Sequence, residues 1–186
     1  MRKFASLLFF AAFSAINVYA QKEDEIAWPN LPIDKETGKI TYTEVVKVDG
    51  VSANDLYDRA MKWFTDYFKN PAEKLRKEDK DNGEIEAFIR YKIYNKDKKG
   101  EQASDAGLVQ YSLILQFKDG RYKYTFTDFN HKEVSYFAIE QWMDKTDEMA
   151  AKHADYLTQV DDQIKEVIKA MVAGIADDGK KPVDDW

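Results

Sequence analysis

Two stretches of alternating apolar and polar residues, 108–118 and 121–129, dominate the hydrophobic pattern of the chain. Large apolar side chains fill the odd positions of the first stretch, and the second begins by alternating aromatic with polar residues. A period of two residues predicts strands with one buried face. Between them, Asp119 and Gly120 predict a two-residue type I′ turn, which requires positive φ at both positions. We therefore expect an antiparallel hairpin at the centre of the fold.

Two further strands follow from the same kind of pattern. Residues 40–48 and 85–94 alternate in polarity, and both are rich in β-branched and aromatic side chains. Residues 95–106, which precede the central hairpin, are mostly small or polar and include several Lys, Asp and Ser residues. This composition predicts an exposed polar loop.

Apolar residues that recur at helical spacing predict two amphipathic helices. The first spans residues 52–69, where Ser52 followed by Asp55 is typical of an N-cap with an acidic first turn. The second spans residues 147–175 and is long enough to run the length of a sheet. Residues 131–145 contain several large apolar side chains, so we expect this connection to close one edge of the core.

Together these elements predict an α+β domain over residues 39–175, with an antiparallel sheet of about four strands. Two helices, one of them long and C-terminal, cover one face of this sheet, and the other face stays open. Residues 21–38 are expected to form an extended lead-in, and residues 176–186 a flexible tail.

The first 20 residues have the pattern of an export signal. Arg2 and Lys3 precede a short apolar run, and small residues lead to Ala20 and Gln21. The run is too short for a comfortable membrane span, so it predicts a signal peptide cleaved near Ala20-Gln21. An uncleaved N-terminal anchor is the alternative. The chain has no cysteine, which excludes disulfides and a lipoprotein anchor. We expect a periplasmic or secreted product without stable membrane insertion after cleavage.

Composition narrows the chemistry further. The formal net charge is −6, with charges of both signs interspersed, and this argues against nucleic-acid binding. The sequence contains no phosphate-cradling glycine loop, nucleophile elbow or HExxH zinc signature. A transition-metal site without cysteine would need both histidines, His131 and His153, together with carboxylates. We therefore expect no metal, no cofactor and no catalytic residue.

The motifs LPID and GKITYTEVV, followed later by DGRYKYTFTDF, resemble those of a family of exported bacterial proteins of unknown function with a TATA-binding-protein-like (TBP-like) fold. The resemblance extends over about residues 31–129. It implies a curved antiparallel sheet with helices on one face, and it supplies no catalytic residue. Likeness of fold to a DNA-binding protein does not imply DNA binding.

The leading hypothesis is a non-enzymatic module that binds a protein, glycan or small-molecule partner through the open sheet face. The candidate binding residues share this predicted face: Arg90, Lys92, Lys123, Thr125 and Thr127. One alternative is a carrier of a small apolar ligand in a helix-grip-like cavity. Another is a hydrolase that uses His131 with a nearby carboxylate, which requires hydrogen-bond contact between the two.

Overall fold

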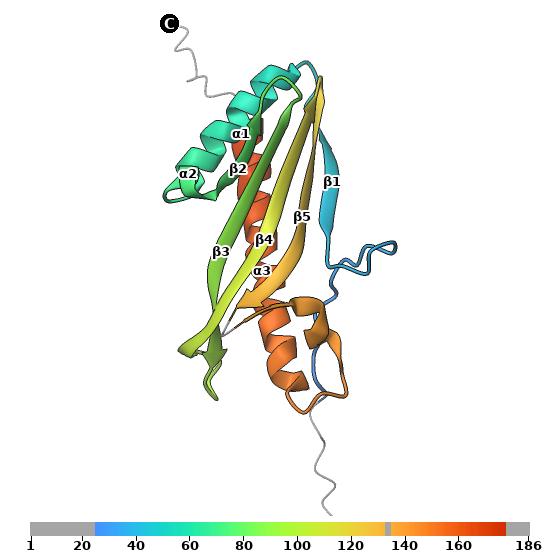
Figure 1. The fold of residues 1–186 in the computed structure, drawn as a ribbon, viewed down its shortest axis with the longest axis vertical. Helices are drawn as coiled ribbons and strands as arrows, with labels where there is room; N and C mark the ends of the chain where they lie inside the picture. Colours follow the sequence, from blue (N-terminus) through green and yellow to red (C-terminus); the bar gives the residue numbers. More distant parts are fainter. Residues whose placement is uncertain (1–24, 133–134, 178–186) are drawn as a thin grey trace, which may run out of the picture.

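One antiparallel sheet organises the part of the chain that the computed structural model describes, residues 25–132 and 135–177 (Figure 1). Its strand order is β1-β5-β4-β3-β2, and a short sixth strand, β6, pairs with β5. The strands are β1 (Tyr42–Lys47), β2 (Leu75–Asp79), β3 (Glu84–Lys96), β4 (Gln102–Lys118), β5 (Arg121–Lys132) and β6 (Tyr136–Ala138). The predicted α+β class is confirmed.

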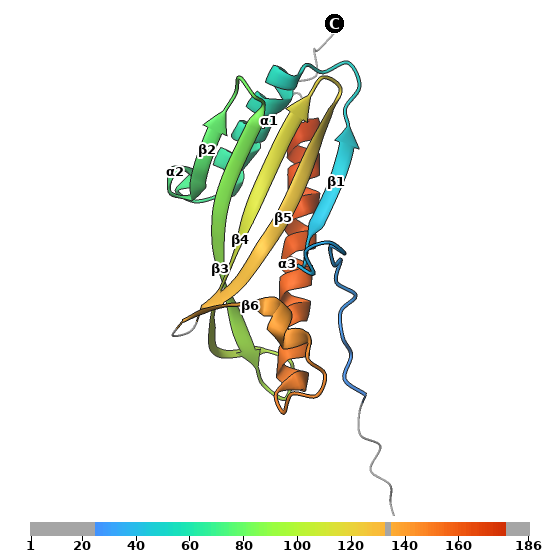
Figure 2. The same ribbon diagram turned by 45° about the vertical axis from the view of Figure 1, so that its right-hand side comes forward.

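Helices α1 (Ala53–Tyr67) and α3 (Ala150–Ala176) lie behind the same face of the sheet, as predicted (Figure 2). Helix α3 runs along the sheet, and two short pieces, α2 (Pro71–Lys74) and the 3-10 turn η1 (Ile139–Met143), complete the fold. The opposite face carries no helix in either view. Within the described ranges, no helix is both long and apolar enough to cross a membrane.

Parts of the predicted domain plan fall outside the described residues. The signal peptide, residues 1–20, lies there, as does the predicted tail beyond Asp177. Helix α3 ends at Ala176, inside the range that was expected to begin the tail. In the lead-in, Trp28 and Leu31 pack against the core as half-buried side chains.

The predicted loop over residues 95–106 is wrong for most of its length. Strand β3 continues to Lys96 and β4 begins at Gln102, so a short turn joins them. The carboxylate of Asp97 shapes this turn, because it accepts hydrogen bonds from the backbone N–H groups of Lys99 and Glu101. The hairpin tip extends beyond the core and is exposed on both faces, so its strands have no apolar alternation.

The sheet also has two short strands that the alternation did not predict. Strand β2 is a charged strand at the edge of the sheet, and β6 pairs only three residues with β5. Charged side chains on an edge strand discourage pairing with other chains, and they also hide the hydrophobic signal of a strand.

The core fills the space between the covered face of the sheet and helices α1 and α3. The inward side chains are those that the alternation predicts, and they include the odd positions of β4 and the even positions of β5 up to Phe126. Fully buried aromatic residues include Phe64, Tyr111, Tyr122, Phe126 and Phe129. Each large buried ring removes about 150–250 Å² of surface from water, so this layer contributes strongly to stability.

Polar side chains of α3 fix the helix along the sheet. The side-chain amide of Gln159 donates to the carbonyl of Tyr94 and accepts from its N–H, at 2.8 and 3.0 Å. Nearer the middle, the hydroxyl of Tyr42 donates to the buried carboxylate of Asp161 at 2.8 Å. Burial and this hydrogen bond raise the pKa of Tyr42. These contacts fix the position of α3 along its axis relative to β3 and β1.

The turn at Asp119-Gly120 is a two-residue connection, but its predicted type I′ geometry is wrong. Gly120 has φ +73°, whereas Asp119 is not among the described residues with positive φ. The turn is shaped by its contact with the start of α1. The carboxylate of Asp119 accepts from the N–H of Ala53 at 2.8 Å, and Gly120 N–H donates to the carbonyl of Val51.

The substitution Gly120→Ala should lower the free energy of unfolding by about 1–2 kcal/mol, the cost of a left-handed conformation at a residue with a side chain. Steric crowding does not contribute, since a Cβ at this position would meet no atom within 4 Å. Urea denaturation measures the change, with Lys98→Ala in the exposed β3–β4 turn as the control. Equal midpoints for the two variants would contradict a strained position.

The substitution Gly174→Ala should destabilise the fold, although alanine favours a helix by about 1 kcal/mol over glycine. A Cβ at Gly174 would lie 2.5 Å from Cδ1 of the buried Trp63, so α1 and α3 could not keep their separation. Chemical denaturation of Gly174→Ala, alone and combined with Trp63→Leu, tests this packing. The alanine should be tolerated better when Trp63 is shortened, and stabilisation by the single change would refute the close contact.

Candidate functional site

The open face of the sheet is built from the side chains opposite the core. Across β1 and β5, Thr43 pairs with Thr125 and Val45 with Lys123. The rows continue onto β4, where Lys123 pairs with Gln116. This face is polar near β5, and Val45 is 52 % exposed on it. Because each strand pair keeps its register, these side chains form regular rows on a fixed surface.

A surface pocket of about 280 Å³ lies where the open face meets the β4–β5 turn. Three cationic side chains line it, Lys118, Arg121 and Lys123. Its other lining residues are uncharged: Val45, Asn82, Gly83, Gln116, Phe117 and Tyr122. We call this the hairpin-end pocket. It is a concave site with positive charge on its rim and no carboxylate in its lining.

The three cations of the hairpin-end pocket have no ionic partner among the described residues. Over residues 25–132 and 135–177, the ion pairs involve other lysines, and the side chains of these three residues make no hydrogen bond. The closest acidic position in the rows is Glu84, which pairs with Gln116, and Lys77 contacts its carboxylate at 3.3 Å. The positive charge of the pocket is therefore available to a ligand.

The predicted binding residues fall into separate places. Lys123, Thr125 and Thr127 follow one another along the open side of β5, and only Lys123 lines the hairpin-end pocket. Arg90 lies two strands away on β3, with its guanidinium over the ring of Phe88.

Lys92 is already engaged by a carboxylate. Its ammonium lies 2.6 Å from Asp105 on β4, and this hydrogen bond raises the pKa of Lys92 and lowers that of Asp105. Sequence reasoning missed Lys118 and Arg121, although both lie on the same side of the hairpin as Lys123. Arg121 lies two residues before Lys123 on β5, and Lys118 pairs with Arg121. Both flank the turn residues Asp119 and Gly120, and the alternation of the strands carries no signal for a pocket at this turn.

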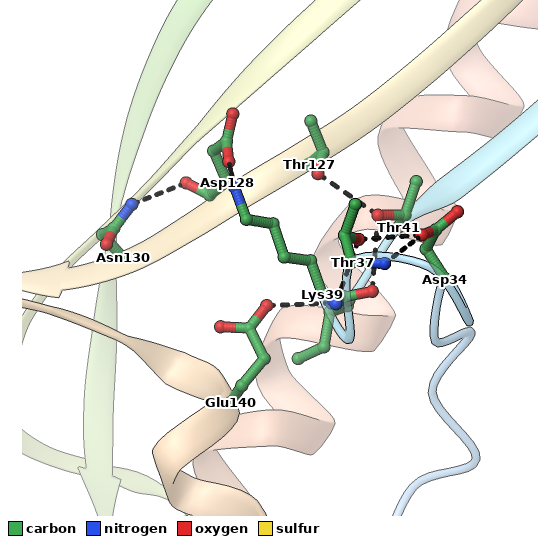
Figure 3. A network of polar contacts seen from close by, with 9 residues as sticks. Asp34, Thr37, Lys39, Thr41, Thr127, Asp128, Asn130 and Glu140 are labelled. Carbon is green, nitrogen blue, oxygen red and sulfur yellow. Dashed lines mark hydrogen bonds and ion pairs between the residues drawn. The ribbon is translucent and has the colours of Figure 1, made fainter.

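The lead-in motif has a structural role. The carboxylate of Asp34 accepts hydrogen bonds from the N–H and the hydroxyl of Thr37, both at 2.8 Å (Figure 3). These bonds lower the pKa of Asp34. They close a tight turn that brings Ile33 beside Ile40 in an isolated β-bridge. The LPID and GKI parts of the motif therefore fold onto each other.

The same network joins the lead-in to β5 and η1. Lys39 reaches the carboxylate of Asp128 at 2.5 Å, and Glu140 accepts from the N–H of Ile40 at 2.8 Å (Figure 3). Asp128 has φ +56°, close to where the register between β4 and β5 shifts. These contacts hold irregular backbone in place, and their charged groups are already paired.

His131 does not have the environment of a general base. Its ring is buried, and Nε2 lies 2.7 Å from the carbonyl oxygen of Ala106. Phe137 and Trp142 pack against it, and Nδ1 has no hydrogen-bond partner in the described part of the chain. The carboxylate contact that the hydrolase alternative requires is absent from the described contacts of this ring. Over the same residues, no group of three or more His, Asp or Glu side chains is placed to hold a metal ion.

The space that an apolar carrier would need is filled by side chains. Tyr111 contacts both Phe126 and Phe129 with ring centroids 5.6 and 5.5 Å apart, and Leu113 and Leu115 beside it are fully buried. These rings lie between the sheet and the helices, where a helix-grip cavity would lie. Close packing of the aromatic layer weighs against the carrier alternative.

Comparison with known proteins agrees with this architecture. Residues 42–132 match the family described as a domain of unknown function (DUF4468) with TBP-like fold. A TBP-like protein from Parabacteroides distasonis ATCC 8503 has a similar structure, with a TM-score of 0.57, 13 % identity, and coverage of 76 % of this chain and 96 % of that chain. A DUF4468 family protein from Bacteroides ovatus ATCC 8483 has a TM-score of 0.55, 18 % identity, and coverage of 76 % and 90 %.

At these identities the solved structures show the fold alone. No curated protein matches the chain. The family match begins with the first residue of β1 and ends with the last residue of β5, so it contains the whole path of the sheet and the hairpin-end pocket. Over residues 42–132, the chain thus contains a region that matches the DUF4468 family of domains with a TBP-like fold.

Proposed function

We propose that this chain is an exported, non-enzymatic binding module that holds an anionic group of its partner in the hairpin-end pocket. One observation carries the proposal: Lys118, Arg121 and Lys123 surround a pocket that no carboxylate lines, and none of the three has an ionic partner among the described residues. The whole chain has a formal net charge of −6. A local cationic concavity on an acidic protein favours anions at that place alone.

The chemistry of the pocket suits a carboxylate or phosphate group. Arg121 offers a planar guanidinium that binds such groups through two parallel hydrogen bonds, and the two lysines add mobile ammonium groups. The amide of Gln116 supplies both a donor and an acceptor for neighbouring hydroxyls. The pocket thus combines charge recognition with hydrogen bonding.

The expected strength of a single bound anion is modest. Each exposed ion pair contributes roughly 0.2–1 kcal/mol, so three of them reach about 1–3 kcal/mol. A dissociation constant of 1 mM corresponds to about −4.1 kcal/mol. A ligand with a single anionic group should therefore bind more weakly than this, with a dissociation constant of roughly 10–200 mM. Binding should weaken further as salt screens the cations.

Titration with glucuronate at constant ionic strength should shift amide NMR signals around Gln116, Lys118, Arg121 and Lys123, whereas glucose should not. Arg121→Gln should reduce the shifts several-fold, because it removes the bidentate donor and keeps similar length. The matched control is Lys169→Gln on the exposed side of α3. Shifts spread evenly over the molecule, or unchanged in Arg121→Gln, would contradict the site.

Export is tested separately by the N-terminus of the purified chain. Intact mass measurement of protein from the cell envelope or medium should give a chain that begins at Gln21. Leu8→Arg places a charge in the apolar run and should leave the precursor with Met1 in the cytoplasm. If the parent chain and the Leu8→Arg variant are both recovered unprocessed from the cytoplasm, the export proposal is refuted.

A further inference from the structure

A second cationic group lies on the same open face, at the β2–β3 edge. The guanidinium carbons of Arg76 and Arg90 lie 5.5 and 5.2 Å from the centre of the Phe88 ring. Glu73, Lys74 and these three residues line a surface hollow of about 120 Å³. We call Arg76, Phe88 and Arg90 the arginine–phenylalanine cluster. An aromatic ring under a guanidinium orients it and leaves its edge N–H groups available.

The two arginines of the cluster keep donors available for a ligand. Arg90 makes no ion pair or hydrogen bond among the described residues. Arg76 donates from one terminal nitrogen to the carbonyls of Glu73 and Leu75, at 3.0 and 3.1 Å. A guanidinium has donors on three nitrogens, so the rest of the Arg76 fork is unused. The cluster is a second place that suits a carboxylate.

Hydroxyl groups occupy the open face between these two cationic groups. Ser112 on β4 pairs with Thr127 on one side and with Phe88 on the other. Thr125 shares a hydrogen bond with Thr43 on β1 at 3.1 Å, and Thr127 shares one with Thr41, the residue before β1, at 3.2 Å. A hydroxyl in such a pair keeps further lone-pair capacity. The surface between the charged ends therefore matches a ligand that is rich in hydroxyl groups.

The separation of the two groups points to an elongated ligand. From Lys123 on β5 to Arg90 on β3, the path crosses two strand spacings and about six residues along the strands. With about 4.8 Å between strands and about 3.3 Å per residue, the diagonal is roughly 22 Å. A single small anion cannot reach both ends.

We propose that the open face binds an acidic oligosaccharide, with one uronate carboxylate in the hairpin-end pocket and another at the arginine–phenylalanine cluster. This inference rests on the proposed function of the pocket and specifies the class of ligand. Carboxylates match the two cationic ends, and sugar hydroxyls match the threonines and Ser112 between them. An acidic peptide fits less well, because apart from Val45 and Ile114 the middle of the face offers few apolar surfaces for its side chains.

One acidic side chain on this path, Glu86, should weaken the binding of an acidic ligand. Glu86 lies on the open side of β3 opposite Ile114, between the row of the pocket and Phe88. Its carboxylate should repel an acidic ligand that follows the diagonal. Removal of this charge should therefore strengthen binding, whereas removal of Arg90 or Lys123 should weaken it.

The test is calorimetric titration of the full chain with galacturonate, digalacturonate and hexagalacturonate at fixed ionic strength, with maltohexaose and hexaglutamate as comparison ligands. Hexagalacturonate should bind about tenfold or more tightly than the monosaccharide, because the second contact forms at a high effective concentration. Arg90→Gln and Lys123→Gln should each remove most of this gain, Glu86→Gln should increase it, and Lys169→Gln should leave it unchanged. Circular dichroism checks that each variant is folded.

The outcomes separate the two proposals. If galacturonate and hexagalacturonate bind equally and Arg90→Gln has no effect, the oligosaccharide inference fails while the pocket stands. If no anion binds at the pocket, both fail. Equal binding of hexaglutamate, with the same response to Arg90→Gln, would overturn the saccharide assignment, and equal binding of maltohexaose would overturn the role of charge.

Discussion

The fold depends on one constraint: the sheet has an aromatic face that must be kept from water. Tyr111, Tyr122 and Phe126 project from β4 and β5 toward the helices and are fully buried. Helices α1 and α3 cover this face together, and their close contact at Gly174 and Trp63 seals one part of it. Since both helices are committed to the same side, the other side remains exposed over the length of the sheet. The open face, where we propose that the partner binds, is a consequence of how the core is covered.

The same packing fixes the end of the sheet where the hairpin-end pocket lies. Asp119 accepts a hydrogen bond from the first turn of α1, and Gly120 exchanges backbone hydrogen bonds with Val48 and Val51. The β4–β5 turn is therefore held against the helix and the end of β1, which limits its motion. Lys118 and Arg121 flank this turn. Their backbone positions are set by contacts on the covered side, and their charged groups are free on the open side.

Local patterns predicted the elements that obey the periodicity of a buried face. Helix α1 begins after its Ser52 cap, and the hairpin keeps the predicted inward and outward sides. Predictions failed where tertiary contacts decide the local structure. The extended tips of β3 and β4 are exposed on both faces. The conformation of the turn at Asp119 is determined by its contact with α1 and not by the Asp119-Gly120 dipeptide alone. The cationic pocket joins the β2–β3 turn, β4, β5 and β1, and only the register of the sheet brings these segments together.

An acidic chain can hold a cationic site because its charges are distributed unevenly over its surface. Lys39, Lys92 and Lys165 each contact an aspartate, and none of these pairs lies at the hairpin-end pocket. Net charge averages over the whole surface, whereas a ligand responds to the potential within about a Debye length, roughly 8–10 Å in physiological salt. Lys118, Arg121 and Lys123 line the hairpin-end pocket, and its lining includes no carboxylate. The acidic balance disfavours large polyanions such as nucleic acid, and the proposed ligand is accordingly a short anionic chain that follows the line between the two cationic groups.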